Sequence, residues 1–85
     1  MRRYFVKIQV LFFAELREMF GASHSLVVPD KIKAGEVTDY FSHDSKTYFL
    51  KKQSLVYAIN ETFEMPDTEL KEGDCLAIMM PMSGG

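Results

Sequence analysis

The sequence predicts a single α+β domain, and three observations support that expectation. Its 85 residues leave room for only one hydrophobic core. With 47% hydrophobic and 26% charged residues, its composition is typical of globular chains. Apolar residues alternate in some stretches and recur at helical spacing in others, in the order strand, helix, strand, helix, strand, short strand, strand.

The first half supplies two of the expected strands. Residues 4–14 predict a long strand, central in its sheet, because Ile8, Val10 and Phe12 alternate with residues that face the other way. Residues 25–30 predict a brief strand that ends at its proline and aspartate.

Two short helices are expected beside these strands. Leu16, Met19 and Phe20 fall at helical spacing, and Gly21 follows as a C-cap. Residues 34–43 repeat that spacing, whereas the pattern of residues 44–53 assigns no element.

The second half predicts a hairpin followed by a buried strand. Residues 55–60 form a strand, and Asn60-Glu61 makes a tight turn into a short return strand at 62–64. Leu70 is expected to plug the core. Residues 75–80 are apolar on both faces, which is typical of a strand inside a sheet, here parallel to the first strand.

Composition argues against several classes of function. A net charge of −2 with no clustered basic residues argues against nucleic-acid binding. No apolar run approaches the roughly 18 residues of a membrane-spanning helix. The start of the sequence predicts a strand and not a signal peptide. A single cysteine, Cys75, excludes an internal disulfide and favours a reducing, cytoplasmic location.

The chain offers no evident active site of its own. His24 and His43 lie far apart, and neither has a metal-ligand spacing to Cys75 or to a carboxylate. Cys75 is therefore expected to be a small core residue, and both histidines to be surface or boundary residues. The glycines at 21, 35 and 73 are isolated, so no phosphate-binding loop is predicted.

The last residues, "PMSGG", predict a flexible arm at 81–85. Pro81 cannot extend a strand ladder because it lacks an N–H group. Four extended residues, Met82 to Gly85, reach about 13 to 14 Å, enough to enter a pocket of a partner. Gly84 and Gly85 have no side chains, so a narrow channel could admit the backbone and the terminal carboxylate.

Three blocks, "VLFFAELREMFG", "AINETF" and "LKEGDCLAIMMPMSGG", resemble the small subunits of molybdopterin synthase and the related ubiquitin-like sulfur carriers. The resemblance covers nearly the whole chain in the right order. It implies a β-grasp fold, a mixed sheet of about four to five strands packed against short helices. It also implies that an activating enzyme adenylates Gly85 and that a sulfur donor converts it to a thiocarboxylate.

The resemblance further implies the partners and their contact residues. The expected partners are the large subunit of the synthase, in a heterotetramer, an adenylating enzyme that uses ATP and Mg, and a sulfur donor such as a cysteine desulfurase or rhodanese. No cofactor is expected on this chain. Gly85 would bear the sulfur and Gly84 would be its spacer. The residues expected near partner surfaces are Phe13, Arg17, Met79, Pro81, Met82 and Ser83.

Two alternatives remain open at the level of sequence. The chain could carry sulfur for thiazole synthesis in the thiamine pathway or for tRNA thiolation. It could instead be a ubiquitin-like modifier that is joined to target proteins through Gly85. Each alternative keeps the glycine tail as the functional group and changes only the partner.

Overall fold

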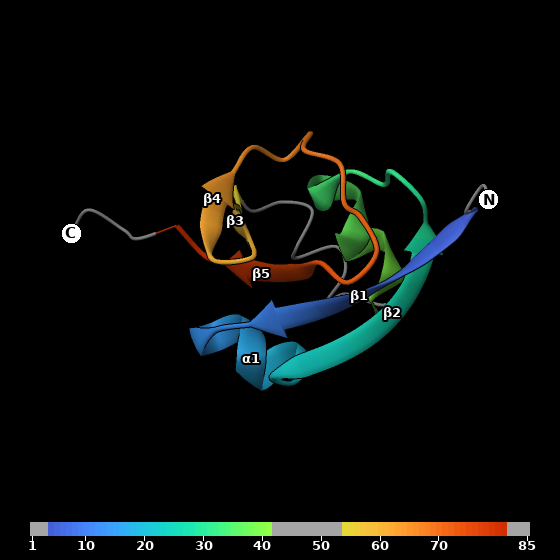
Figure 1. Ribbon diagram of the computed structural model, residues 1–85. Coiled ribbons are helices and arrows are strands. Elements are labelled where there is room, and N and C mark those ends of the chain that lie inside the picture. The colour runs from blue at the N-terminus through green and yellow to red at the C-terminus, as the bar shows by residue number, and fades with distance from the viewer. Residues whose placement is uncertain (1–3, 42–53, 82–85) are drawn as a thin grey trace.

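The computed structural model describes residues 4–41 and 54–81 and forms one mixed sheet with two helical segments (Figure 1). The elements in chain order are β1 (Phe5–Phe12), α1 (Ala14–Phe20), β2 (Ser23–Pro29), the 3₁₀ helix η1 (Ala34–Tyr40), β3 (Val56–Ile59), β4 (Thr62–Glu64) and β5 (Cys75–Met79).

The sheet has the strand order β2-β1-β5-β3-β4. β1 runs antiparallel to β2 and parallel to β5, while β3 runs antiparallel to both β5 and β4. β5 is therefore the middle strand and β1 an interior strand. The expected parallel pairing of the first and last strands is confirmed, as is the hairpin at Asn60 and Glu61.

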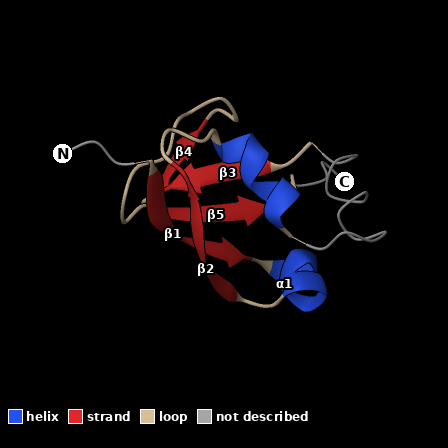
Figure 2. Cartoon of the chain, turned by 90° about the vertical axis from the view of Figure 1, so that its right-hand side faces the viewer, coloured by secondary structure: helices blue, strands red, loops and turns tan. Residues whose placement is uncertain are grey.

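The core lies on the face of the sheet that carries the even-numbered residues of β1. Val6, Ile8, Val10 and Phe12 are all nearly inaccessible there, because alternate residues of a strand point to one face. The helical segments cover this face, and Figure 2 shows η1 lying across β3 and β5. The other buried members of the core are Leu16, Val28, Ile32, Ala34, Val37, Phe41, Tyr57, Ile59, Leu70, Leu76 and Ile78.

Local turn chemistry sets the boundaries of several elements. Gly21 ends α1 with φ 95° and donates its N–H to the Arg17 carbonyl at 2.8 Å. Asn60 and Glu61 have φ values of 51° and 71°, the left-handed pair that a two-residue hairpin requires. Leu70 is fully buried, as expected for a core plug.

Several boundaries differ from the sequence expectation. β1 ends at Phe12, two residues before the expected end, because Phe13 caps α1 and Ala14 begins that helix. β2 begins at Ser23, two residues before the expected start, because β1 offers a continuous ladder from Phe5 to Leu11. The second helical segment is a 3₁₀ helix and ends at Tyr40. The expectations for residues 42–53 fall outside the described residues. Among the residues that are described, no helix is long and apolar enough to cross a membrane.

Candidate functional site

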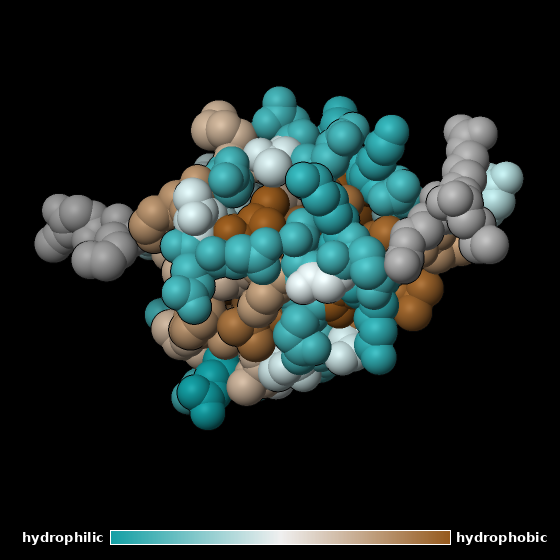
Figure 3. Space-filling view, viewed as in Figure 1, coloured by the Kyte–Doolittle hydropathy of each residue, from teal (hydrophilic) through white to brown (hydrophobic). Residues whose placement is uncertain are grey.

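The face of the sheet opposite the core carries a group of apolar side chains, here called the docking face: Leu11, Phe13, Phe63, Ala77 and Met79. Register places Leu11, Ala77 and Phe63 in one row, because Leu11 pairs with Ala77, Ala77 with Ala58, and Ala58 with Phe63. In Figure 3, hydrophobic surface shows among hydrophilic side chains over the region where Figure 1 labels β3, β4 and β5.

Phe13 connects β1 to α1 and belongs to this face. Its backbone is extended (φ −123°, ψ 156°), so its side chain continues the outward alternation of β1 past Phe12. Ala14 then turns the chain sharply with φ 50°, and α1 begins. The Phe13 side chain is 46% exposed, which is unusual for a phenylalanine in a small domain.

Arg17 lies one helical turn after Phe13 and is exposed. Its N–H donates to the Phe13 carbonyl at 3.4 Å, which ties the first turn of α1 to its N-cap residue. A guanidinium beside an exposed aromatic group suits a partner that presents both an apolar surface and a carboxylate. The shallow hollow around α1 is lined by Ala14, Glu15, Arg17 and Glu18.

Met79 ends β5 at the edge of the docking face, opposite Val56. It is half-buried, and Pro81 beyond it is exposed. Pro81 follows the strand at once, in agreement with its expected role of ending the ladder. Met82, Ser83, Gly84 and Gly85 lie outside the described residues.

Phe63 is the member of the docking face that sequence reasoning missed. Its side chain is 73% exposed, the largest exposed fraction among the described large hydrophobic residues. It sits on the three-residue strand β4, which is too short to show a period of its own. The available signal was its position three residues after Asn60, since the tight turn fixes which β4 side chain faces away from the core.

Polar side chains limit the docking face along β1 and β2. The Gln9 amide donates to the Ser23 hydroxyl, and the Ser25 hydroxyl donates to Gln9 Oε1 at 3.0 Å. Beyond them lies a second apolar pair, Phe5 and Val27, which are 62% and 65% exposed. The open side of the sheet therefore has two apolar ends separated by a polar band.

A hydrogen-bonded network fixes the start of β5. The Asn60 amide donates to Asp74 Oδ1 at 2.9 Å, and Asn60 Oδ1 accepts the Cys75 N–H at 2.9 Å. The second carboxylate oxygen of Asp74 accepts the Lys71 N–H at 2.8 Å. This network ties the β3–β4 turn to β5, and so it sets the register of the strand that leads to Met79.

The position of Cys75 differs from the sequence expectation of a small core residue. It is half-exposed on the open side of the sheet and is not a core residue, because only the alternate residues Leu76 and Ile78 point into the core. His24 agrees with the expected boundary role. Its ring lies edge-on to Phe12 and Phe41, and its Nε2 bonds the Phe20 carbonyl at the end of α1.

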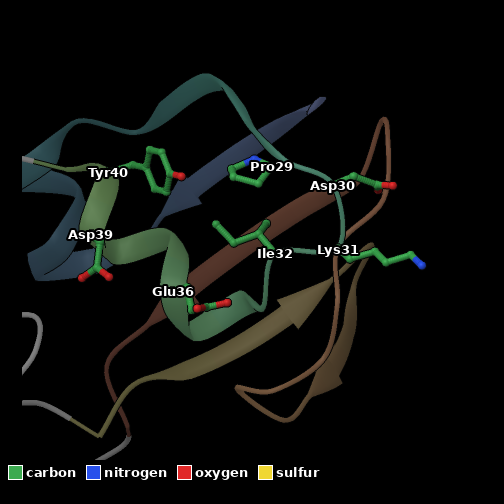
Figure 4. A pocket seen from close by; sticks show the side chains of 7 residues that line it. All are labelled: Pro29, Asp30, Lys31, Ile32, Glu36, Asp39 and Tyr40. Carbon is green, nitrogen blue, oxygen red and sulfur yellow. The ribbon is translucent and has the colours of Figure 1, made fainter. Parts of the chain in front are cut away.

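Neither a metal centre nor an enclosed cavity is evident in the described part of the chain. No three histidine, cysteine or acidic side chains there are placed to hold a metal ion. A hollow of about 470 Å³ lies between η1 and the turn that follows β2. In Figure 4, Tyr40 and Ile32 face its interior. Asp30 and Lys31 point away from the hollow, whose lining also includes Glu36 and Asp39 of η1.

Among the ionisable groups of the described residues, Tyr57 has a perturbed pKa. Burial of the Tyr57 side chain on the core face of β3 removes water from its hydroxyl and raises the pKa of that phenol above its usual value of 10.0. Because Tyr57 faces the core and not the docking face, this shift concerns the stability of the fold.

Residues 10–85 match the model of the ThiS family. The chain belongs to the ThiS family. A curated relative from Drosophila erecta, the molybdopterin synthase sulfur carrier subunit, is 40% identical over 84 residues, which cover 94% of this chain and 92% of the relative. The protein of the same description from Haemophilus influenzae is 32% identical over 80 residues, covering 92% and 99%.

Solved structures agree with the fold of this ThiS-family chain. A Pyrococcus furiosus protein described as molybdopterin converting factor subunit 1 has a TM-score of 0.72 at 20% identity, covering 91% of this chain and 99% of that one. A Caldiarchaeum subterraneum ubiquitin has a TM-score of 0.56 at 16% identity, covering 95% and 99%. A chain from the Helicobacter pylori complex of molybdopterin-converting factor subunits 1 and 2 has a TM-score of 0.59 at 18% identity, covering 94% and 100%.

These comparisons confirm the expected β-grasp fold and the expected sulfur-carrier family. Within the ThiS-family chain, the structure brings Phe13 and Met79 to one face, with Arg17 beside them on α1 and Pro81 at the exit. The roles of these four residues in partner binding stay predictions. So do the roles of Met82, Ser83, Gly84 and Gly85, which the structure does not describe.

Proposed function

We propose that this ThiS-family chain is the sulfur carrier subunit of a molybdopterin synthase and that Gly85 carries the sulfur as a thiocarboxylate. The observation that supports this most directly is the path of β5. The strand passes through the middle of the docking face and ends at Met79, six residues before Gly85. Six extended residues reach about 20 Å. A partner bound to the docking face could therefore receive the terminal carboxylate in its own active site.

The chemistry requires activation of Gly85, because a carboxylate is a poor electrophile. An activating enzyme, which would use ATP and Mg, forms an acyl-adenylate at Gly85 and releases pyrophosphate. The terminal sulfur of a persulfide on a sulfur donor, such as a cysteine desulfurase or rhodanese, then displaces AMP to give an acyl disulfide. A second thiol cleaves the S–S bond of this intermediate, which leaves a terminal thiocarboxylate on Gly85 and a disulfide between the two thiols. This chain supplies the carboxylate and the docking face, and its partners supply the catalytic groups.

The consumer of the sulfur is the large subunit of the synthase, which would use it to build the dithiolene of molybdopterin. The names of the curated relatives and the two-subunit complex from Helicobacter pylori support this assignment. Each loaded tail delivers one sulfur, so two loadings serve one product. A heterotetramer of two small and two large subunits in the cytoplasm is the assembly we propose.

The test is co-expression with a cognate activating enzyme and sulfur donor, followed by intact mass measurement. The expected result is exchange of one oxygen for one sulfur at Gly85. Deletion of Gly85 should abolish that exchange and leave the thermal melt nearly unchanged, because a single terminal residue is expected to add little stability. The proposal fails if the shortened chain still delivers sulfur to the large subunit, or if isopeptide-linked adducts form in place of a thiocarboxylate.

A further inference from the structure

The two edges of the sheet differ in how well they are protected from other strands. β4 is three residues long, with Glu61 before it and Glu64 at its end. β2 is seven residues long, contains no charged side chain and pairs with β1 in an unbroken register. Edge strands are normally kept from pairing by short length, charge, bulges or proline. Of these protective features, β2 has a proline, Pro29, at its last position.

Hydrogen bonding along β1 shows which backbone groups of β2 point away from the sheet. The Asp30 N–H donates to Tyr4 and the Phe12 N–H to Ala22, so even-numbered residues form the bonded pairs of this ladder. The N–H groups of the odd-numbered residues Ser23, Ser25 and Val27 therefore face outward. Among the residues that the structure describes, these three amides have no acceptor.

Apolar side chains adjoin this open edge on both of its faces. Val27 is 65% exposed on the open side of the sheet, and Phe5, 62% exposed, lies diagonally beside it on β1. Leu26 is half-buried on the opposite face. A strand that pairs with this edge would therefore meet apolar side chains above and below the hydrogen bonds, a setting that favours an uncharged, β-branched strand.

We propose that the β2 edge pairs with the β2 edge of a second copy of this chain, antiparallel about Val27. In this register Val27 lies opposite Val27 of the second copy, and Leu26 lies opposite Val28. About four new backbone hydrogen bonds form between the two β2 strands. Pro29 has no N–H group, so the pairing leaves no donor of this residue unsatisfied. The strand is thus complementary to itself in both hydrogen bonding and side-chain character.

Charge does not oppose this pairing. Lys7 is opposite Val27 on β1, so the two Lys7 side chains of a dimer are separated by three strand spacings, about 14 Å. That distance exceeds the screening length of about 8 Å in physiological salt. A contact of one strand with one strand is expected to bury less than the roughly 1,200 Å² of a stable interface. The expected dimer is therefore weak, with a dissociation constant of about 0.1 to 1 mM.

The pairing lies away from the docking face. Phe5 and Phe13 are at opposite ends of β1 and its extension, about 26 Å apart at 3.3 Å per residue. The proposal therefore does not depend on the identity of the sulfur acceptor. Self-association and partner docking can be measured separately on the same chain.

Sedimentation velocity on the full chain, from about 10 µM to about 1 mM, tests the proposal. The mass should rise toward that of a dimer, and Val27→Lys should weaken association at least tenfold by placing like charges on directly opposed residues. Val27→Thr is the matched control, because it keeps a β-branched, neutral side chain and should retain most of the association. Neither change should unfold the chain, since Val27 is mainly exposed.

Amide hydrogen exchange provides the second readout. On concentration, exchange at Ser25 and Val27 should slow several-fold, while Leu26 and Val28, already bonded to β1, should not change. A chain that stays monomeric at about 1 mM overturns the proposal, as does a dimer that Val27→Lys leaves intact. If only the cognate large subunit protects these two amides, the edge belongs to that partner and the proposal is equally wrong.

Discussion

Phe63 provides the sharpest test of the docking face. Its side chain is 73% exposed on β4, and a phenylalanine has roughly 200 Å² of side-chain surface, so about 150 Å² is available to a partner. At about 25 cal/mol per Å², full burial of that area is worth up to about 3.7 kcal/mol. Allowing for incomplete burial and for the methyl group that threonine retains, Phe63→Thr should cost about 2 to 3 kcal/mol of binding free energy.

That cost corresponds to a 30- to 150-fold weaker affinity, roughly, for the cognate large subunit, measured by titration calorimetry at micromolar concentration. Stability should fall by only about 1 kcal/mol, because about 50 Å² of Phe63 is buried in the free chain. Phe5→Thr is the matched control. It removes a similarly exposed phenylalanine from the other end of the sheet and should leave this affinity unchanged.

The reasoning is refuted by either of two results. Phe63→Thr could bind within twofold of the unmodified chain, which would show that partners do not cover β4. Phe5→Thr could weaken binding as much as Phe63→Thr, which would show that any exposed aromatic group on the sheet has the same effect. A thermal melt of each variant confirms that binding is compared between folded proteins.

Three further predictions concern stability. Glu61→Gly should raise the free energy of unfolding by about 0.5 kcal/mol, because glycine accepts the φ of 71° without a Cβ clash. A melting temperature that is unchanged or lower contradicts this prediction. Asn60→Gly keeps the turn but removes the side-chain hydrogen bonds to Asp74 and Cys75, so the free energy of unfolding in urea should fall by about 2 kcal/mol. An unchanged free energy of unfolding would show that this network does not stabilise the fold. Burial raises the pKa of Tyr57, so the folded state favours the neutral phenol. This contribution to stability is fully present below pH 10 and is lost as the pH rises through the raised pKa. In Tyr57→Phe, which has no phenol to ionise, the free energy of unfolding should decline less over that range.

The parts of the fold that sequence predicted are those set by local patterns. Alternation in β1 predicted the face that carries Ile8 and Val10, and both are buried. The Asn60-Glu61 pair predicted a turn because few other sequences tolerate two consecutive residues with positive φ. The apolar character of β5 on both faces predicted an interior position, and β5 is the middle strand.

The remaining features depend on contacts between distant segments. Phe63 faces outward because Ala58 pairs with it, and no pattern within a three-residue strand encodes that register. Cys75 looked like a core residue because β5 is apolar on both faces, yet the described helical segments, α1 and η1, cover the face opposite Cys75. The position of His24 depends on Phe41, which is 17 residues away and packs against its ring at 5.1 Å.

The arrangement of β5 suits the sulfur transfer that we propose for the C-terminal residues. β5 is hydrogen-bonded to β1 on one side and to β3 on the other, and Leu76 and Ile78 anchor it in the core. Two hydrogen-bonded ladders and the buried side chains therefore hold β5 in place when a partner binds beyond it. An edge strand would be held by one ladder. Met79 lies where this rigid strand ends. The position of Met79 relative to the docking face is thus fixed by the strand that ends there.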